Sequence, residues 1–261
     1  MIPGITDEKS SVCLLYHDVV DKANAEQSGN VTEGSLRYKI SPDLFRSHLE
    51  TIQASKYTVR TIPEEERESV YITFDDGGSS MMHAADLLEE HDMRGHFFII
   101  TNRIGDDRYL SWPEVRELDA RGHVIGSHTV THAALTGCTS IDLQHELLES
   151  KRHIAEEINS CETLSIPRGQ YNEAVYSAAK DAGYEYIFTS DPRRVSTLNT
   201  RTLGRWNIWT DTTCDEVRQI LSAAPLYYFR VAGRWRALAL LKSTIGLERY
   251  LRFRNAVLRR L

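Results

Sequence analysis

The sequence has little of what marks a disulfide-rich, membrane-spanning or nucleic-acid-binding protein. Its four cysteines are scattered with no Cys-x-x-Cys spacing, which argues against a disulfide framework or a cysteine zinc site. No run approaches the ~20 apolar residues of a membrane-spanning helix, and Met1–Ser10 contains no apolar signal segment. The net charge of −6 argues against nucleic-acid binding by the whole chain. We therefore expect a cytoplasmic protein, while noting that a secreted protein without its signal peptide would look the same.

Short apolar strands and amphipathic helices alternate along most of the 261 residues. Such alternation predicts a parallel sheet with helical crossovers, and the length suits a single α/β barrel. Residues 21–39 are polar and predict a surface loop. The strands are expected at about 11–16, 57–61, 70–74, 96–101, 123–126, 164–167 and 186–189, and the helices at about 42–54, 80–91, 112–121, 141–159 and 172–181.

Two adjacent aspartates follow the apolar strand at 70–74. Gly77 and Gly78 end that strand and allow the backbone to turn, so Asp75 and Asp76 should lie at its carboxyl end. In α/β folds that is where the chemistry takes place. Adjacent carboxylates repel each other unless a cation binds one of them. The pair therefore predicts that one aspartate binds a metal and the other stays free as a base.

Two histidines, His128 and His132, follow another predicted strand. They are four residues apart, so on a helical turn both rings would point the same way. Two imidazoles and one carboxylate leave an open position for water, as hydrolytic zinc sites require. Taken alone, the pair could be two surface histidines at a helix start. With the two aspartates, it predicts a divalent metal site, with Zn²⁺ as the first choice and Co, Ni, Mn or Fe as alternatives.

The stretches 73–77 (Thr-Phe-Asp-Asp-Gly) and 127–132 (Ser-His-Thr-Val-Thr-His) resemble the first two motifs of the polysaccharide deacetylases, the NodB-homology or carbohydrate esterase 4 type. The resemblance covers about residues 11–210 and implies a distorted, incomplete (β/α) barrel. In that family the first Asp is the general base, and the second binds the metal together with the two histidines. The resemblance thus implies Asp75 as the base and, as metal ligands, Asp76, His128 and His132.

Residues 165–172 (Ser-Ile-Pro-Arg-Gly-Gln-Tyr-Asn) resemble the third family motif, with departures. Ser165 stands where the family has the arginine that orients the base, and Arg168 stands where it has a tyrosine. The family uses the backbone N–H at the latter position to hold the oxyanion, which Arg168 can still do. We expect Arg168 and Tyr171 at the substrate site, although a plain turn before a helix would also fit. What orients Asp75 stays open.

No histidine follows His153, so the general acid of the family's C-terminal Leu-x-His motif is missing from its usual place. Leu15-Tyr16-His17 has that pattern near the N-terminus, which resembles the permuted arrangement of the poly-N-acetylglucosamine deacetylases. The resemblance implies His17 as the acid, and the alternative is a histidine that only caps a strand. For the fourth motif, Asp191 and residues 206–209 are weak candidates.

The function implied by the resemblance is metal-dependent removal of an acetyl group from an N-acetylated sugar in a poly- or oligosaccharide, as in exopolysaccharide biosynthesis. Asp75 would take the proton of the attacking water, and His17 would protonate the leaving amine. Two other functions stay open. One is a non-catalytic sugar-binding protein with a degenerate site. The other is a non-haem iron oxygenase with a two-histidine, one-carboxylate site, against which the alternation of strands and helices argues.

The C-terminal segment differs from the rest in charge. From Leu221 onward nine Lys and Arg residues face Glu248 alone, a net +8 that leaves −14 for the preceding residues. We predict a deacetylase-like barrel over 1–222 and a basic helical extension over 223–261. The extension could pack on the barrel with solvated arginines. It could also make a peripheral contact with an anionic membrane, at the inner face of which the enzyme would then act.

Overall fold

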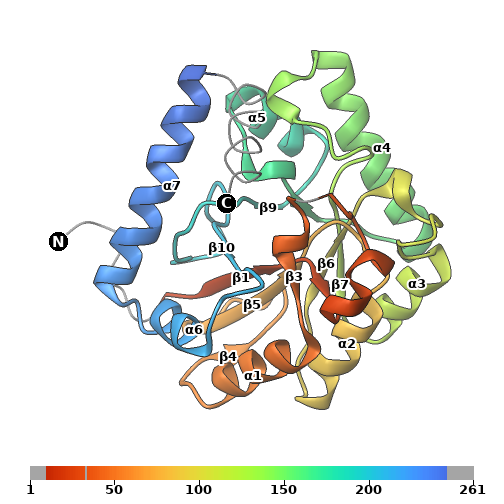
Figure 1. The fold of residues 1–261 in the computed structure, drawn as a ribbon. Coiled ribbons are helices and arrows are strands. Elements are labelled where there is room, and N and C mark those ends of the chain that lie inside the picture. The colour runs from red at the N-terminus through yellow and green to blue at the C-terminus, as the bar shows by residue number, and fades with distance from the viewer. Residues whose placement is uncertain (1–9, 33, 246–261) are drawn as a thin grey trace.

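The core of the protein is a parallel sheet that curls on itself and is surrounded by helices (Figure 1). A computed structural model describes residues 10–32 and 34–245, and for 238–245 it describes the backbone alone. The main sheet has eight strands in the order β10-β1-β5-β6-β7-β8-β9, with β4 paired to β5, and a separate two-stranded sheet joins β2 and β3. The strands are β1 Val12–Tyr16, β2 Asp18–Val19, β3 Lys39–Ile40, β4 Thr58–Val59, β5 Ser69–Phe74, β6 His96–Ile99, β7 Val124–Ser127, β8 Thr163–Ser165, β9 Tyr186–Phe188 and β10 Trp206–Asn207.

Seven α-helices are described, and most follow a strand. Their starts carry the expected caps: Ser41 accepts a hydrogen bond from the N–H of Leu44, and Asn172 accepts one from Val175. The helices are α1 Pro42–Gln53, α2 Met81–Glu90, α3 Trp112–Ala120, α4 Ser140–Ile158, α5 Glu173–Asp181, α6 Cys214–Leu221 and α7 Pro225–Ile245.

Side chains of the sheet alternate between two apolar clusters. On β5, Val70, Ile72 and Phe74 pack in the larger cluster, which includes the helices, and Tyr71 packs in a smaller one with Phe98 of β6. All six residues of β5 are buried, as expected for a parallel strand covered on both faces. Because successive side chains of a strand point to opposite faces, the residues after Tyr71 on its face are Thr73 and Asp75. The side chain of Asp75 therefore points to the inner face of the curled sheet.

One segment touches both edges of the curled sheet. Leu203 forms a bridge with Phe188 at the end of β9, and residues 206–207 pair with β1. The segment 203–207 thus brings the two edges close together, so the sheet forms a distorted, incomplete barrel. The predicted fold class is confirmed.

The segment at 21–39 differs from the predicted surface loop. It contains two short 3-10 helices, η1 Lys22–Gln27 and η2 Leu36–Tyr38, and it runs into β3. Ser28 and Lys39 are buried, and both pair with the carboxylate of Asp18 in β2. The prediction of a surface loop was therefore wrong only for the short helices and these buried side chains, since most other described residues of 21–39 are exposed or partly exposed.

Helix α7 begins the predicted basic extension. Tyr228 and Ala232 are buried, and the ring of Trp206 contacts that of Tyr228, so the first turns of α7 pack on the barrel. Residues 246–261 of the extension lie outside the described residues. Within 10–32 and 34–245, no helix combines the length and apolar character needed to cross a membrane. The division of the chain at residue 222 stays a prediction.

Candidate active site

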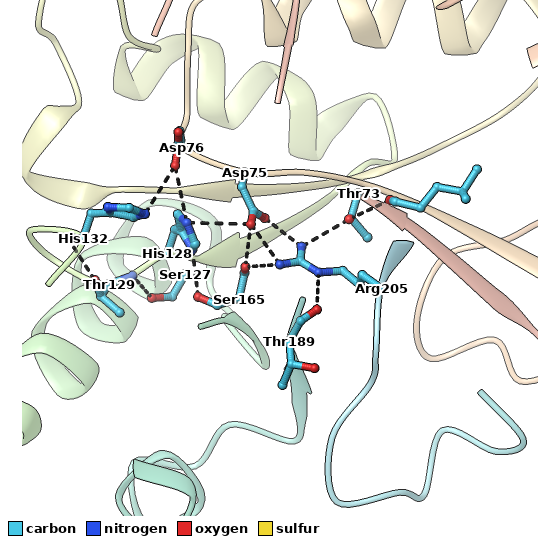
Figure 2. Close-up of polar contacts among 11 residues, drawn as sticks. Thr73, Asp75, Asp76, Ser127, His128, Thr129, His132, Ser165, Thr189 and Arg205 are labelled. Atoms are coloured by element: carbon cyan, nitrogen blue, oxygen red, sulfur yellow. Dashed lines mark hydrogen bonds and ion pairs between the residues drawn. The ribbon is translucent and has the colours of Figure 1, made fainter. Parts of the chain in front are cut away.

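Asp75, Asp76, His128 and His132 gather at the carboxyl ends of strands of the main sheet (Figure 2). Asp75 and Asp76 follow β5, and His128 follows β7. His17 follows β1, whose Tyr16 pairs in register with Phe74, and the N–H of Asp75 donates to the carbonyl of Tyr16 at 3.1 Å. The parallel register therefore brings His17 alongside the two aspartates.

Asp76, His128 and His132 form a group that could hold a metal ion. One potential ligand atom from each lies within 4.8 Å of the other two. Nε2 of His128 is 3.4 Å and Nε2 of His132 is 3.7 Å from Oδ1 of Asp76. Nδ1 of His128 lies 2.8 Å from the carbonyl oxygen of Ser165, to which it can donate, and this leaves Nε2 as the ligand atom. Two imidazoles and a carboxylate suit a divalent transition metal, so the residues fit the implied group.

The histidine pair converges through an irregular turn and not through a helix. Thr129 and His132 have φ values of +67° and +63°, in the left-handed region. Glu146 of α4 is buried and accepts the N–H groups of Val130 and Thr131, each at 2.9 Å. The predicted helical turn was wrong, because the strand β7 ends at Ser127 and a buried carboxylate fixes the backbone that follows.

Arg205 is the residue that sequence analysis missed. Its guanidinium donates to both oxygens of Asp75, at 2.8 and 2.9 Å, and to Oγ of Ser165 at 2.7 Å. Ser165 in turn donates to Asp75 at 2.9 Å. Arg205 belongs to the segment that closes the barrel, is fully buried, and donates from Nε to the carbonyl of Thr189 at 3.0 Å (Figure 2). A guanidinium thus meets Asp75 although the third motif carries a serine.

Although both aspartates are buried, their pKa values lie below the usual value of an aspartate and not above it. Burial opposes ionisation of Asp75, but the charge of Arg205 and then that of His128 outweigh it, so the pKa of Asp75 lies below its usual value. Burial also opposes ionisation of Asp76, and the hydrogen bond from His128 does most to lower the pKa of Asp76. Both carboxylates are therefore ionised at neutral pH.

The pKa values of His128 and His132 are shifted in opposite directions. Burial lowers the pKa of His132 to about 4, with the charge of His128 as the second cause and that of Arg168 as a smaller one. Burial also acts to lower the pKa of His128, but Asp75 and Asp76 raise it above its usual value. A neutral His132 presents the lone pair that a metal ligand needs.

The other predicted residues occupy varied positions. Arg168 is exposed with a φ of +60°, and its charge reaches His132. The hydroxyl of Tyr171 lies 3.3 Å from Oγ1 of Thr202. Trp206, a weak candidate for the fourth motif, is buried in the core, whereas the ring of Trp209 lies beside that of Tyr38. The substrate-binding roles of Arg168 and Tyr171 stay predictions.

Comparison with known proteins bears on this site. The family model described as polysaccharide deacetylase matches residues 63–187. A peptidoglycan-N-acetylglucosamine deacetylase of Bacillus cereus is 30% identical over 147 residues, which cover 54% of this chain and 67% of that protein. The chain belongs to the polysaccharide deacetylase family. Another member, the putative polysaccharide deacetylase YxkH of Bacillus subtilis, is 29% identical over 70% of this chain and 65% of its own length. The chain thus spans about two thirds of these curated relatives.

Solved structures support the same fold. The Streptococcus pyogenes deacetylase PplD in complex with acetate has a TM-score of 0.69 and 20% identity, covering 81% of this chain and 98% of that one. IcaB from Ammonifex degensii gives a TM-score of 0.69 and 20% identity over 82% of this chain and 97% of its own. At this level of identity the likeness concerns the deacetylase fold alone.

Proposed function

We propose that this protein is a metal-dependent deacetylase that hydrolyses the N-acetyl group of a sugar within a poly- or oligosaccharide. The observation that carries the proposal is that two adjacent aspartates have different partners. Asp76 faces His128 and His132, whereas Asp75 is held by Arg205. Base-assisted hydrolysis requires an ionised carboxylate that lies beside the metal-binding group but is not one of its ligands. Family membership supports the same chemistry.

In the proposed reaction each residue has one task. Asp76, His128 and His132 would hold the ion, with Zn²⁺ as our choice, which when bound polarises the acetyl carbonyl and makes water more acidic. Asp75 takes the proton of the attacking water, and the low pKa of Asp75 keeps it ionised for this step. The backbone N–H of Arg168 stabilises the negative oxygen. His17 gives a proton to the nitrogen as the C–N bond breaks, so acetate and the free amine leave.

Acetate release from a panel of N-acetylated oligosaccharides, with and without a chelator, tests the proposal. We expect acetate only with metal, and a loss of about 10²–10⁴-fold in rate for Asp75→Asn and for His17→Ala, because each removes one proton-transfer group. Both variants should keep the metal, as measured by elemental analysis, whereas His128→Ala should lose it. No acetate from any substrate by the metal-loaded protein would favour a non-catalytic sugar-binding protein.

We also propose that the basic extension contacts an anionic membrane surface. Helix α7 exposes Leu226 (87%) and Phe229 (52%), and the side chain of Arg230 on the same face is 69% exposed. An exposed face that combines apolar and basic side chains is typical of interfacial helices. A cytoplasmic enzyme that acts on a lipid-linked glycan would benefit from such a contact.

Vesicle flotation tests the membrane proposal separately from catalysis. The full chain should float with anionic vesicles more than with zwitterionic ones, and added salt should weaken this binding. The double variant Leu226→Ser, Phe229→Ser should bind less while its acetate release stays unchanged. Equal partitioning of both proteins in both kinds of vesicle would end the idea.

A further inference from the structure

The ring of His17 is held by packing. Its centroid lies 4.3 Å from that of Tyr38, with the planes tilted by 37°. The ring of Tyr38 in turn lies 4.5 Å from that of Trp209, whose other contacts include the guanidinium of Arg37 at 5.0 Å. Nδ1 of His17 is buried, and among residues 10–32 and 34–245 it has no hydrogen-bond partner. A hydrogen bond at one ring nitrogen commonly orients a functional histidine; at His17 the contact with the ring of Tyr38 is in a position to do so instead.

A buried ion pair fixes the two backbones that carry these rings. Asp18 and Lys39 are partners in the register of β2 and β3, and their charged groups lie 3.2 Å apart with side-chain exposures of 8% and 3%. His17 immediately precedes Asp18, and Tyr38 immediately precedes Lys39. The pair thus sets the distance between the His17 and Tyr38 backbones.

The same carboxylate ties both strands to the loop that follows the metal ligand Asp76. Asp18 accepts hydrogen bonds from Ser28 at 2.6 Å and from Ser80 at 2.9 Å. A Cβ at Gly78 would lie only 2.3 Å from Oδ1 of Asp18, so the glycine is what allows this close approach. Asp18 therefore connects the strands that carry His17 and Tyr38 to the loop that follows Asp76.

We propose that Tyr38 is a positioning residue for His17: its ring holds the imidazole in the orientation from which His17 gives its proton. The proposal rests on the proposed role of His17 as the proton donor. Proton transfer needs a donor within hydrogen-bond reach of the acceptor, and a displacement of about 1 Å can cost ~10²-fold in rate. Tyr38 acts through its ring, so phenylalanine should replace it.

Steady-state kinetics on an N-acetylated oligosaccharide test this. Tyr38→Ala should lower kcat by about 10- to 100-fold with KM unchanged, and Tyr38→Phe should restore kcat. In a His17→Ala background, Tyr38→Ala should have no further effect, because the group that it positions is gone. Leu36→Ala is the matched control, since Leu36 is an exposed residue of the same short helix η2. Metal content and thermal unfolding should match the parent in each variant.

Three results would overturn the proposal. These are a raised KM with unchanged kcat, which would make Tyr38 a substrate contact, a Phe variant as poor as the Ala variant, or equal losses with and without His17. Histidine-labelled NMR spectra give a readout independent of activity: Tyr38→Ala should shift the His17 ring signals and Tyr38→Phe should preserve them. Full activity of His17→Ala would instead refute the proton-donor role, and with it the premise.

Discussion

At the residue scale, two neighbours of identical chemistry have different environments. Asp75 continues the inward face of β5 and meets a buried guanidinium, whereas Asp76 has a φ of +81° and faces two imidazoles. A positive φ is costly for a residue other than glycine, and such conformations persist where the surrounding structure fixes them. The strained backbone at Asp76 is therefore part of the reason why the two carboxylates point to different partners.

Replacement of Arg205 should show how far Asp75 depends on it. Arg205→Lys cannot make two parallel hydrogen bonds to a carboxylate, and we expect kcat/KM to fall by about 10- to 100-fold because the base loses its orientation. Arg205→Ala removes the guanidinium that pairs with the buried Asp75 and leaves it only the weaker contacts with Ser165 and His128, so it should lower the free energy of unfolding by about 3–5 kcal/mol, measured in urea. Arg201→Lys, at an exposed position four residues earlier in the chain, is the control. Equal effects at the two sites would contradict the assignment.

At the scale of elements, the connection from β7 to α4 determines the geometry of the metal group. The two histidines lie on a short irregular turn, and this turn is fixed from α4 by a single carboxylate. Glu146 is 6% exposed and also accepts the hydroxyl proton of Thr131. Three donors of one turn thus share one side chain, so the position of His132 depends on a residue of the following helix.

Glu146→Gln should weaken metal binding. An amide offers one acceptor oxygen in place of two and turns its N–H groups toward donors, so part of the turn loses its partner. Outer partners of metal ligands typically contribute 10- to 100-fold in affinity, and we expect a loss of about that size in competition with a chromophoric chelator. Glu149→Gln, at a partly exposed position of α4 that contacts Arg152 and not the turn, should bind metal like the parent. Unchanged metal affinity in Glu146→Gln would show that the turn keeps its conformation without the carboxylate of Glu146.

At the scale of the whole molecule, a buried histidine links stability to pH. His96 of β6 is fully buried; its Nε2 accepts the N–H of Ile62 at 3.0 Å, and its Nδ1 donates to the carbonyl of Ile72 at 3.2 Å. The bond that Nε2 accepts from Ile62 requires the neutral ring, because a protonated Nε2 has no lone pair to accept it. Burial lowers the pKa of His96 to about 4. The histidine thus joins the segment after β4 to the sheet only while it is uncharged.

The protein should lose stability as the pH falls from about 6.5 to about 4. In that range the unfolded chain binds a proton at this histidine before the folded one does, so unfolding becomes easier, by on the order of 3 kcal/mol over the full range. Urea unfolding at several pH values, with a chelator present, measures this. His96→Gln should flatten the slope, whereas His145→Gln, at an exposed position, should keep it. A slope unchanged in His96→Gln would assign it to other groups.

Much of this protein could be predicted from local patterns. The alternation of strands and helices predicted the barrel, because hydrophobic periodicity and caps act over a few residues. Asp75-Asp76 and the histidine pair predicted a metal group, and the structure brings Asp76, His128 and His132 together. The helical turn expected at the histidines failed, because Glu146, fourteen residues further on, fixes a different backbone there.

Local sequence was enough to predict the strand that ends in two aspartates, the histidine pair that joins one of them, and the early position of His17. The residue that holds Asp75 could be found only in the folded protein. Arg205 is 130 residues away in the chain and reaches Asp75 because the segment 203–207 closes the barrel between β9 and β1. Likewise, the contact between His17 and Tyr38 depends on a two-stranded pairing fixed by a buried charge pair. Such contacts form only when distant segments pack, and no local pattern records them.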